Sequence, residues 1–149
     1  MYHTYSESGL DNIVLANGFK VHTTPYGEAI AIDHPEALHK AIANNLVRRA
    51  HPLNGAELRF LRHELEFSQK QLANMFGIGE QALARWEKDR KKPLPGMADR
   101  LVRILYREHL EQQPALGETL ERLMNAANVQ SVPLRLRETS GEWAVDLAA

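Results

Sequence analysis

The chain contains no cysteine among its 149 residues. A cysteine nucleophile and a zinc site built from paired cysteines are therefore excluded. No apolar run approaches the roughly 18 residues needed to cross a membrane, and no charged-then-apolar leader opens the sequence. We expect a cytoplasmic protein with no membrane segment.

Motifs for catalysis and for metal binding are also lacking. The sequence has no G-x-S-x-G elbow, no phosphate-binding loop and no carboxylate pair at a recognisable spacing. Its seven histidines are scattered, with neither an H-x-x-x-H nor an H-E-x-x-H spacing, which favours surface or capping roles for them. We expect a protein that is not an enzyme and that needs no cofactor or metal ion.

The net charge of −1 is unevenly distributed along the chain. Residues 51–110 hold eleven lysines and arginines against eight acidic residues, whereas residues 1–50 and 111–149 are each net acidic. A basic segment between two acidic ones indicates a local contact with the phosphates of a nucleic acid.

Two short helical patterns meet at Gly77 with almost no residues between them. Ser68 precedes Gln71 by three residues, which is a capping box that begins a helix, and Gly77 favours the left-handed conformation that ends it. The apolar face of this helix is formed by Leu72, Ala73 and Phe76. A second helix over residues 79–89 follows at once. This is the pattern of a helix-turn-helix, whose second helix enters the major groove of DNA.

The second helix of the motif separates into two faces. Leu83 and Trp86 form an apolar stripe, and we predict that Trp86 belongs to the core and does not stack on a base. Glu80, Gln81 and Arg85 lie on the opposite side, with one helical turn between Gln81 and Arg85. Long polar side chains therefore share one exposed face.

Further helices are predicted on both sides of this pair. Asn54 followed by Glu57 signals the start of a helix that ends near Phe67. After the pair, the prolines of the basic turn 88–95 break the chain, and a fourth helix begins at about Gly96. The inner faces of these helices are formed by Leu58, Leu61 and Leu65 in the first and by Leu101, Ile104 and Leu105 in the last.

Residues 53–110 resemble a Cro/CI-type helix-turn-helix domain. The match consists of a glutamine just after the first cap of the motif (Gln69), a tight turn, and a second helix that ends in an aromatic residue followed by glutamate (Trp86-Glu87). The resemblance implies that Glu87 pairs with Arg62 of the preceding helix. We interpret Arg62 and Glu87 as a structural ion pair and not as DNA contacts.

A second resemblance concerns the N-terminal part, where residues 7–18, 24–27 and 38–42 are similar to the MqsA-type (YgiT-type) antitoxins and regulators. This resemblance implies that Gln81 and Arg85 read bases and that the N-terminal domain meets a toxin partner. Known members carry an N-terminal zinc site made of paired cysteines, which this chain cannot form.

Two positions of the motif depart from the family pattern. Gly79 replaces the usual Ser or Thr cap of the second helix, which costs roughly a few tenths of a kcal/mol and removes a side chain that often contacts phosphate. Asp89 stands where the family favours glycine, so the helix either runs on or ends with Asp89 in a left-handed conformation.

The expected DNA contacts follow from these placements. Arg85 is predicted to bind guanine O6 and N7 and Gln81 to pair with a base edge such as that of adenine, while Glu80 either accepts from cytosine N4 or stabilises the helix N-terminus. Phosphate contacts are expected from Ser68, Gln69, Lys70, Gly79, Lys88, Arg90, Lys91 and Lys92. For each lysine of the basic turn, a merely solvated position is the alternative.

Upstream of the motif the sequence predicts a small β-rich module. Strands over residues 12–16 and 19–23 flank Asn17-Gly18, which is a strong hairpin signal. A third strand over residues 28–33 and a helix over residues 35–49 follow, with Leu38, Ile42 and Leu46 directed inward. This module either binds a protein partner or buttresses the DNA-binding domain.

Downstream, an amphipathic helix is predicted over residues 116–129, with Leu120, Leu123 and Met124 on its apolar side. Strands over residues 132–138 and 142–147 then form a second hairpin around Thr139-Ser140-Gly141. A lone hairpin is marginal in water, so it must pack on its own domain, on the N-terminal sheet or on a partner subunit, and we expect dimerisation.

The sequence as a whole predicts an α+β fold in three parts: an N-terminal module (1–50), an all-α helix-turn-helix domain (51–111) and a C-terminal helix with a hairpin (112–149). The predicted function is that of a sequence-specific transcriptional regulator, a repressor, that binds double-stranded DNA at a palindromic operator as a homodimer. The alternative is an antitoxin of a toxin–antitoxin system, which binds its toxin through the N-terminal module and autoregulates its operon.

Overall fold

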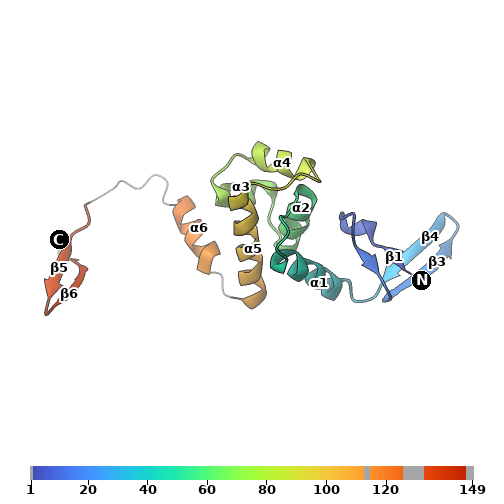
Figure 1. Ribbon diagram of the computed structural model, residues 1–149, viewed down its shortest axis with the longest axis horizontal. Helices are drawn as coiled ribbons and strands as arrows, with labels where there is room; N and C mark the ends of the chain where they lie inside the picture. Colours follow the sequence, from blue (N-terminus) through green and yellow to red (C-terminus); the bar gives the residue numbers. More distant parts are fainter. Residues whose placement is uncertain (1, 113–114, 126–132, 147–149) are drawn as a thin grey trace.

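The computed structural model of the chain describes residues 2–112, 115–125 and 133–146. Short antiparallel strands lie toward both ends of the described chain and consecutive α-helices lie between them, which confirms the predicted α+β class (Figure 1). The elements are β1 (His3–Thr4), η1 (Ser6–Ser8), β2 (Val14–Leu15), β3 (Phe19–Thr24), β4 (Gly27–Ile32), α1 (Pro35–Arg48), α2 (Gly55–Glu64), α3 (Gln69–Phe76), α4 (Glu80–Lys88), α5 (Gly96–Glu111), α6 (Ala115–Asn125), β5 (Leu136–Thr139) and β6 (Glu142–Val145).

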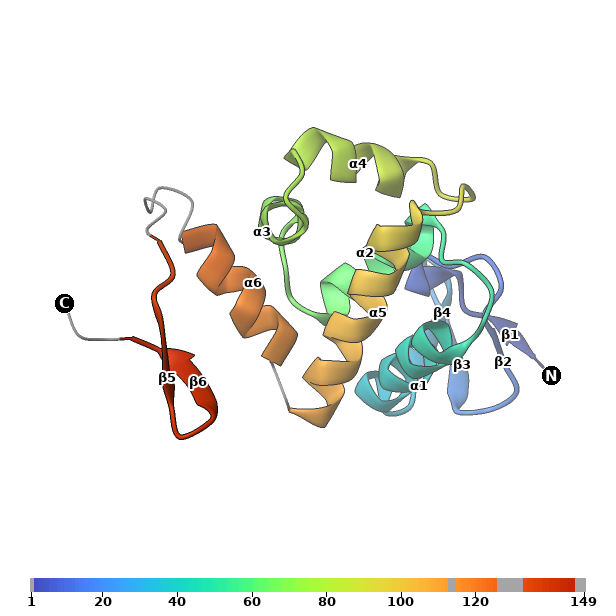
Figure 2. The ribbon, with the colours of Figure 1, turned by 60° about the vertical axis from the view of Figure 1, so that its left-hand side comes forward.

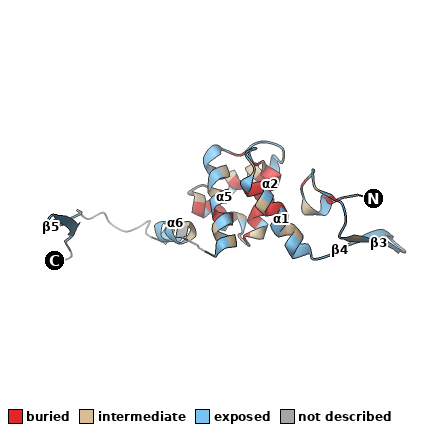
Figure 3. Ribbon diagram, turned by 60° about the horizontal axis from the view of Figure 1, so that its bottom comes forward, coloured by how far each residue is buried: buried red, intermediate tan, exposed pale blue. Residues whose placement is uncertain are grey.

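Helices α1 to α5 surround the hydrophobic core, and most buried residues lie on their inward faces (Figure 3). The largest side chains that are almost completely removed from water are Leu53, Leu58, Leu61, Leu72, Leu83 and Val102. Burial of one such leucine contributes about 1.5–3 kcal/mol, so the interior of the bundle supplies the main stabilisation of this region.

The predicted capping box at Ser68 and the predicted N-terminal cap at Asn54 are confirmed, and the cap at Asn54 is also a capping box. Asn54 accepts from the backbone N–H of Glu57, whose carboxylate accepts from the N–H of Asn54, each at 2.9 Å. Ser68 and Gln71 repeat this exchange at the start of α3, at 3.0 and 2.8 Å. These contacts satisfy N–H groups that a helix start leaves without a partner. The predicted end of α2 near Phe67 is wrong, because the helix stops at Glu64 and the chain turns.

The inner face of α5 differs in part from the prediction. Leu105 is buried as expected, but Ile104 is 46 % exposed and Leu101 only partly buried. The buried positions of α5 are Ala98, Val102, Leu105 and Tyr106. These four residues form a buried stripe with spacings of four, three and one. Because Ala98 and Tyr106 belong to it, the pattern of leucine and isoleucine alone did not reveal this stripe.

The predicted hairpin around Asn17-Gly18 is wrong. Strand β3 pairs instead with β4, in a register that runs from Phe19 opposite Ile32 to Thr24 opposite Gly27, whereas β2 pairs with β1. The hydroxyl of Thr24 stabilises the turn, since it donates to the carbonyl of Gly27 at 2.6 Å and accepts from the N–H of Tyr26 at 3.2 Å. The hairpin of β3 and β4 has six residue pairs, and its pairing is preferred over the shorter hairpin that the local Asn17-Gly18 turn signal favoured.

Three polar contacts attach the N-terminal segment to the bundle. The hydroxyl of Tyr5 lies 2.8 Å from Nε2 of His39, and Nδ1 of that ring lies 3.3 Å from the Glu64 carboxylate. Further along, Arg90 donates to the carbonyl of Gly9 at 2.7 Å and to the Asp11 carboxylate at 3.2 Å. The segment that precedes the β3–β4 hairpin is therefore bound to α1 and to the loop after α4, and His39 connects the first of these contacts to α2.

Helix α6 lies against α3 and α5 (Figure 2), where Leu116 and Leu120 pack on the core. The other two predicted apolar positions, Leu123 and Met124, are 65 % and 37 % exposed. The expected helix over 116–129 is observed from Ala115 to Asn125, and its last four predicted residues lie outside the described part.

A C-terminal hairpin forms around Ser140-Gly141, as predicted, but its strands are shorter than predicted: β5 begins at Leu136 and β6 ends at Val145. Val132 and Leu147 lie outside the described residues. Every residue of these two strands is exposed, and the hairpin stands apart from the helices (Figure 1). Within the described part of the chain, the expected packing surface for this hairpin is therefore not found. Among the same residues, no helix is both long and apolar enough to cross a membrane.

Candidate nucleic-acid interface

Helices α3 and α4 are joined by a turn of three residues. Gly77 ends α3 in the left-handed conformation, with a φ of 69°, as its position in the sequence predicted. The N–H of Ile78 donates back to Ala73 at 3.0 Å, and the extended Gly79 then begins α4. A turn this short fixes the direction of α4 relative to α3.

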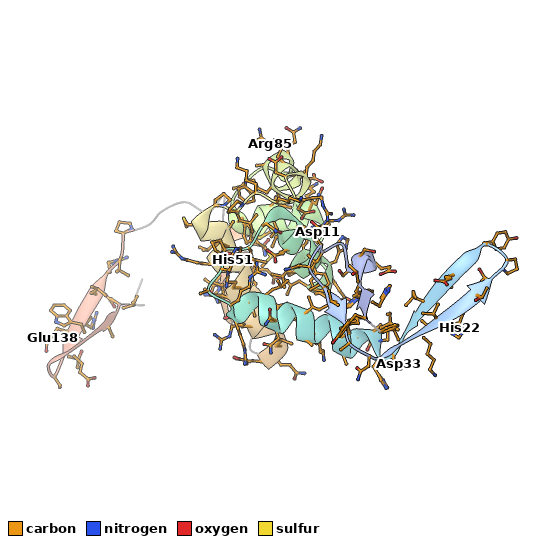
Figure 4. The ribbon with its side chains drawn as sticks, turned by 45° about the vertical axis from the view of Figure 1, so that its right-hand side comes forward. Asp11, His22, Asp33, His51, Arg85 and Glu138 are labelled. Carbon is orange, nitrogen blue, oxygen red and sulfur yellow. The ribbon has the colours of Figure 1, made fainter. Side chains whose placement is uncertain are left out.

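Helix α4 divides into a buried and an exposed face. Leu83 is fully buried, and Trp86 packs against the core. Glu80, Gln81 and Arg85 are exposed, and Arg85 extends from the outer edge of the molecule, away from the helices that support α4 (Figure 4). The predicted base-reading residues therefore form one accessible face on a helix whose other face is fixed. Helix α4 ends at Lys88, and Asp89 has a φ of −81°, so neither sequence alternative for this end is observed.

The start of α2 meets the end of α4 through backbone atoms. A Cβ atom added at Gly55 would collide with the carbonyl oxygen of Trp86, so only glycine permits this approach. The N–H of Ala56 donates to the carbonyl of Arg90 at 3.1 Å. The positive end of the α2 dipole thus faces the negative end of α4, which is a favourable arrangement.

A buried ion pair connects the same two helices. Nε and Nη2 of Arg62 donate to the two carboxylate oxygens of Glu87, at 2.7 and 2.9 Å, which is the pairing that the family resemblance implied. Nη1 of Arg62 donates to the carbonyl of Phe67 at 3.0 Å. A two-point contact of this kind restricts both the position and the rotation of α4.

Most of the predicted phosphate-binding residues surround α4 at the surface. Ser68, Lys70, Gly79, Lys88, Lys91 and Lys92 are exposed. Gln69 is only partly exposed, because its Nε2 turns inward and donates to Glu87 at 3.1 Å. Its side chain therefore supports the ion pair, and only part of Gln69 remains accessible at the start of α3.

Arg90 is placed differently from the rest of the basic turn. Its guanidinium is directed to Gly9 and Asp11 in the N-terminal segment, so in this structure it does not lie free beside α4. The contact joins residues that are 81 and 79 positions apart, and no local sequence signal indicates it.

Arg59 and His63 of α2 were not among the predicted contacts, although their i,i+4 spacing places both on one face of the helix. They line an open pocket of about 390 Å³ between α2, the start of α3 and α4. The remaining lining residues are Arg62, Gln69, Ala84, Glu87 and Lys88. Desolvation lowers the pKa of His63, and the neighbouring Arg62 and Arg59 lower it further.

The described residues contain no group of three His, Cys, Asp or Glu side chains that could hold a metal ion. The exposed face of α4, its basic surroundings and the tight turn before it are the features of a surface that binds an extended polyanion.

Comparison with known protein families agrees with this geometry. The family model described as Helix-turn-helix matches residues 58–106, which run from α2 into α5. Residues 58–106 are a helix-turn-helix domain of the Cro/CI type. This domain supports binding to double-stranded DNA and a role in transcription regulation. Neither a curated protein nor a solved structure matches the chain.

Proposed function

We propose that the protein is a sequence-specific transcriptional repressor that reads the major groove of DNA with α4. The observation that carries this proposal is the division of α4 into a buried face and an exposed face with Glu80, Gln81 and Arg85. Because Arg62 binds both oxygens of Glu87, the exposed side chains are presented in a fixed orientation.

Each exposed side chain has a chemical complement among the bases. The guanidinium of Arg85 matches O6 and N7 of guanine, and the amide of Gln81 matches N6 and N7 of adenine. Glu80 lies in the first turn of α4, where it accepts from cytosine N4 or favours the helix N-terminus. The exposed lysines 70, 88, 91 and 92 provide sequence-independent attraction to phosphates.

In this proposal the protein acts as a homodimer on a palindromic operator, and the C-terminal hairpin joins the two copies. Leu136, Trp143 and Val145 share one face of the hairpin with Glu138 in the observed register, and each of these three apolar side chains is more than half exposed. Contact with a second copy would remove this apolar face from water. Two copies of α4 would then enter major grooves about 34 Å apart.

The test is binding of a labelled fragment of the protein's own promoter, measured by fluorescence anisotropy. Arg85→Ala is expected to lose about 1–3 kcal/mol of binding free energy and to bind related sequences more equally, whereas Lys91→Ala weakens binding to all sequences alike. Arg107→Ala, an exposed arginine near the far end of α5, is the matched control. Equal sequence preference in wild type and Arg85→Ala would exclude base reading by Arg85.

A second candidate function is that of an antitoxin, as the MqsA-type resemblance implies. The β3–β4 hairpin favours it, because it projects from the bundle and is not explained by DNA binding (Figure 1). Tyr26 at its tip is fully exposed, and Val21 is 43 % exposed on the face that it shares with Phe19 and Ile30. Residues 1–50 would then bind the partner, residues 51–111 the DNA, and residues 112–149 the second copy.

The antitoxin candidate is tested with the product of a small open reading frame next to the gene. Co-expression and gel filtration are expected to give a stable complex, and Tyr26→Ser combined with Val21→Ser is expected to dissociate it without loss of promoter binding. A complex of unchanged affinity after these substitutions would exclude the hairpin as the binding surface. The absence of any complex would favour the plain repressor.

A further inference from the structure

The pocket between α2, α3 and α4 is lined largely by cationic side chains. Arg59 and His63 enter it from α2, and Lys88 enters it from the last turn of α4. The remaining charges, those of Arg62 and Glu87, neutralise each other through two short hydrogen bonds. Arg59 and Lys88 therefore give the pocket an excess of positive charge, and protonation of His63 increases it.

This pocket is continuous with the base-reading face. Ala84 and Lys88, which line it, follow Gln81 by three and seven residues and so lie on the same side of α4. Gln69, at the first turn of α3, forms another part of the wall. When α4 lies in the major groove, one strand of the duplex must pass beside these residues, with its phosphates toward the pocket.

We propose that Arg59 and His63 of α2, together with Lys88, bind a backbone phosphate of duplex DNA, and that His63 takes up a proton when it does so. This inference rests on the proposed DNA-binding function and adds to it a third helix and a dependence on pH. The helix before the motif thus contributes directly to DNA binding, besides its role as a support.

The charges around His63 give the proton uptake its direction. Desolvation and the cations Arg62 and Arg59 lower the pKa of His63 in the free protein, and Glu87 and Glu64 oppose this in part. His63 also lines a second pocket, together with Glu7, His39, Glu64 and Arg90. A phosphate beside the ring favours the imidazolium, so the bound protein holds the proton to higher pH than the free protein. Affinity for DNA must therefore rise as the pH falls from the pKa of His63 in the bound protein to its lower pKa in the free protein.

The experiment measures binding of a short labelled duplex with no operator sequence, over a range of salt concentrations and between about pH 8 and about pH 6. The variants are Arg59→Gln and His63→Gln. Their matched controls are Arg107→Gln on α5 and His22→Gln on β3, which lies far from Arg85 (Figure 4). Circular dichroism confirms that each variant is folded.

Arg59→Gln is expected to reduce the slope of log affinity against log salt by about 1, because one phosphate contact is lost. Wild type and both controls are expected to gain affinity on acidification, by no more than about tenfold per pH unit for one proton. His63→Gln is expected to match wild type at about pH 8 and to lack this gain.

Three results overturn the inference. In the first, the salt slope of Arg59→Gln equals that of Arg107→Gln. In the second, the pH profile of His63→Gln equals that of wild type. In the third, wild type binds neither this duplex nor the promoter fragment. The last result also removes the proposed function. The first two leave that function intact, since it is tested separately by Arg85→Ala on the promoter fragment.

Discussion

Arg62 binds Glu87 through two parallel hydrogen bonds, from Nε to Oε2 at 2.7 Å and from Nη2 to Oε1 at 2.9 Å. Only 9 % and 4 % of the two side chains are exposed, so neither charge is well solvated by water. Gln69 adds a third donor to the same carboxylate. The end of α4 is thus joined to α2 and to the start of α3 at a single group.

Removal of Arg62 should be far more costly than removal of a surface charge. Arg62→Ala leaves Glu87 buried without its cation, and we expect a loss of about 3–5 kcal/mol in the free energy of unfolding. Urea denaturation measures this loss. Arg107→Ala, which breaks an exposed pair with Glu111, is expected to change it by no more than about 1 kcal/mol. Equal effects of the two substitutions would show that the buried pair is not a major stabilising contact.

Glycine-to-alanine substitutions at two helical positions should have opposite effects on the free energy of unfolding. Gly55→Ala forces Cβ against the Trp86 carbonyl and is expected to cost about 1–3 kcal/mol or more. Gly117→Ala, on α6, meets no atom within 4 Å and is expected to add about 0.5–1 kcal/mol through helix propensity. Thermal unfolding of both variants provides the measurement. A stable Gly55→Ala protein with unchanged DNA affinity would contradict the close approach of α2 and α4.

The contact between Arg90 and Asp11 should weaken DNA binding. Asp11→Asn removes a negative charge beside the basic loop and lets Arg90 turn toward phosphate, so affinity for any duplex should increase by up to about fivefold. Anisotropy titration at low salt measures this change. Asp33→Asn makes the same change of charge at the base of the β3–β4 hairpin, far from Arg85 (Figure 4), and is the control. If both variants gain equally, net charge and not the Arg90 contact is responsible.

Tyr5 should make stability sensitive to alkaline pH. Burial raises the pKa of Tyr5 above its ordinary value of 10.0, and Glu7 and Glu64 raise it further. The unfolded chain therefore loses this proton at lower pH than the folded chain, so stability is lost as the pH rises above about 10. Tyr5→Phe should show a smaller loss in chemical denaturation over this range, with Tyr26→Phe, at a fully exposed tyrosine, as the control. An identical pH dependence in wild type and Tyr5→Phe would contradict a protonated, buried Tyr5.

Local signals predicted the central part of the fold well. The two capping boxes and the turn at Gly77 depend on contacts between residues at most five positions apart, and such contacts are written in the sequence itself. The division of α4 into faces depends on the helical period alone, and it placed Leu83 inside and Gln81 outside. Where the structure depends on contacts between residues close in sequence, the sequence was enough to predict it.

Long-range competition explains what sequence patterns missed. The Asn17-Gly18 signal favoured a hairpin, but β3 gained a longer register with β4, and the sequence does not show which pairing has the lower free energy. The partners of Arg90 and the place of Gln69 beside Glu87 depend on how separate elements pack. Arg59 and His63 lie on a helix that the family pattern gives only as a support for the motif, and only its packing beside α4 brings them to the pocket.

The meeting of α2 and α4 at Gly55 has a consequence for how this scaffold can be altered. The two helices approach each other through main-chain atoms, which have no rotamers to repack when outward-facing side chains change, and the Arg62–Glu87 pair that also restricts α4 is buried. If α4 reads bases as proposed, exchange of residues 80, 81 and 85 should therefore redirect the domain to new target sequences without changing the orientation of α4. The residues proposed to select the DNA sequence are therefore different from the atoms that hold α4 in place, which makes this domain a suitable scaffold for engineering new DNA specificities.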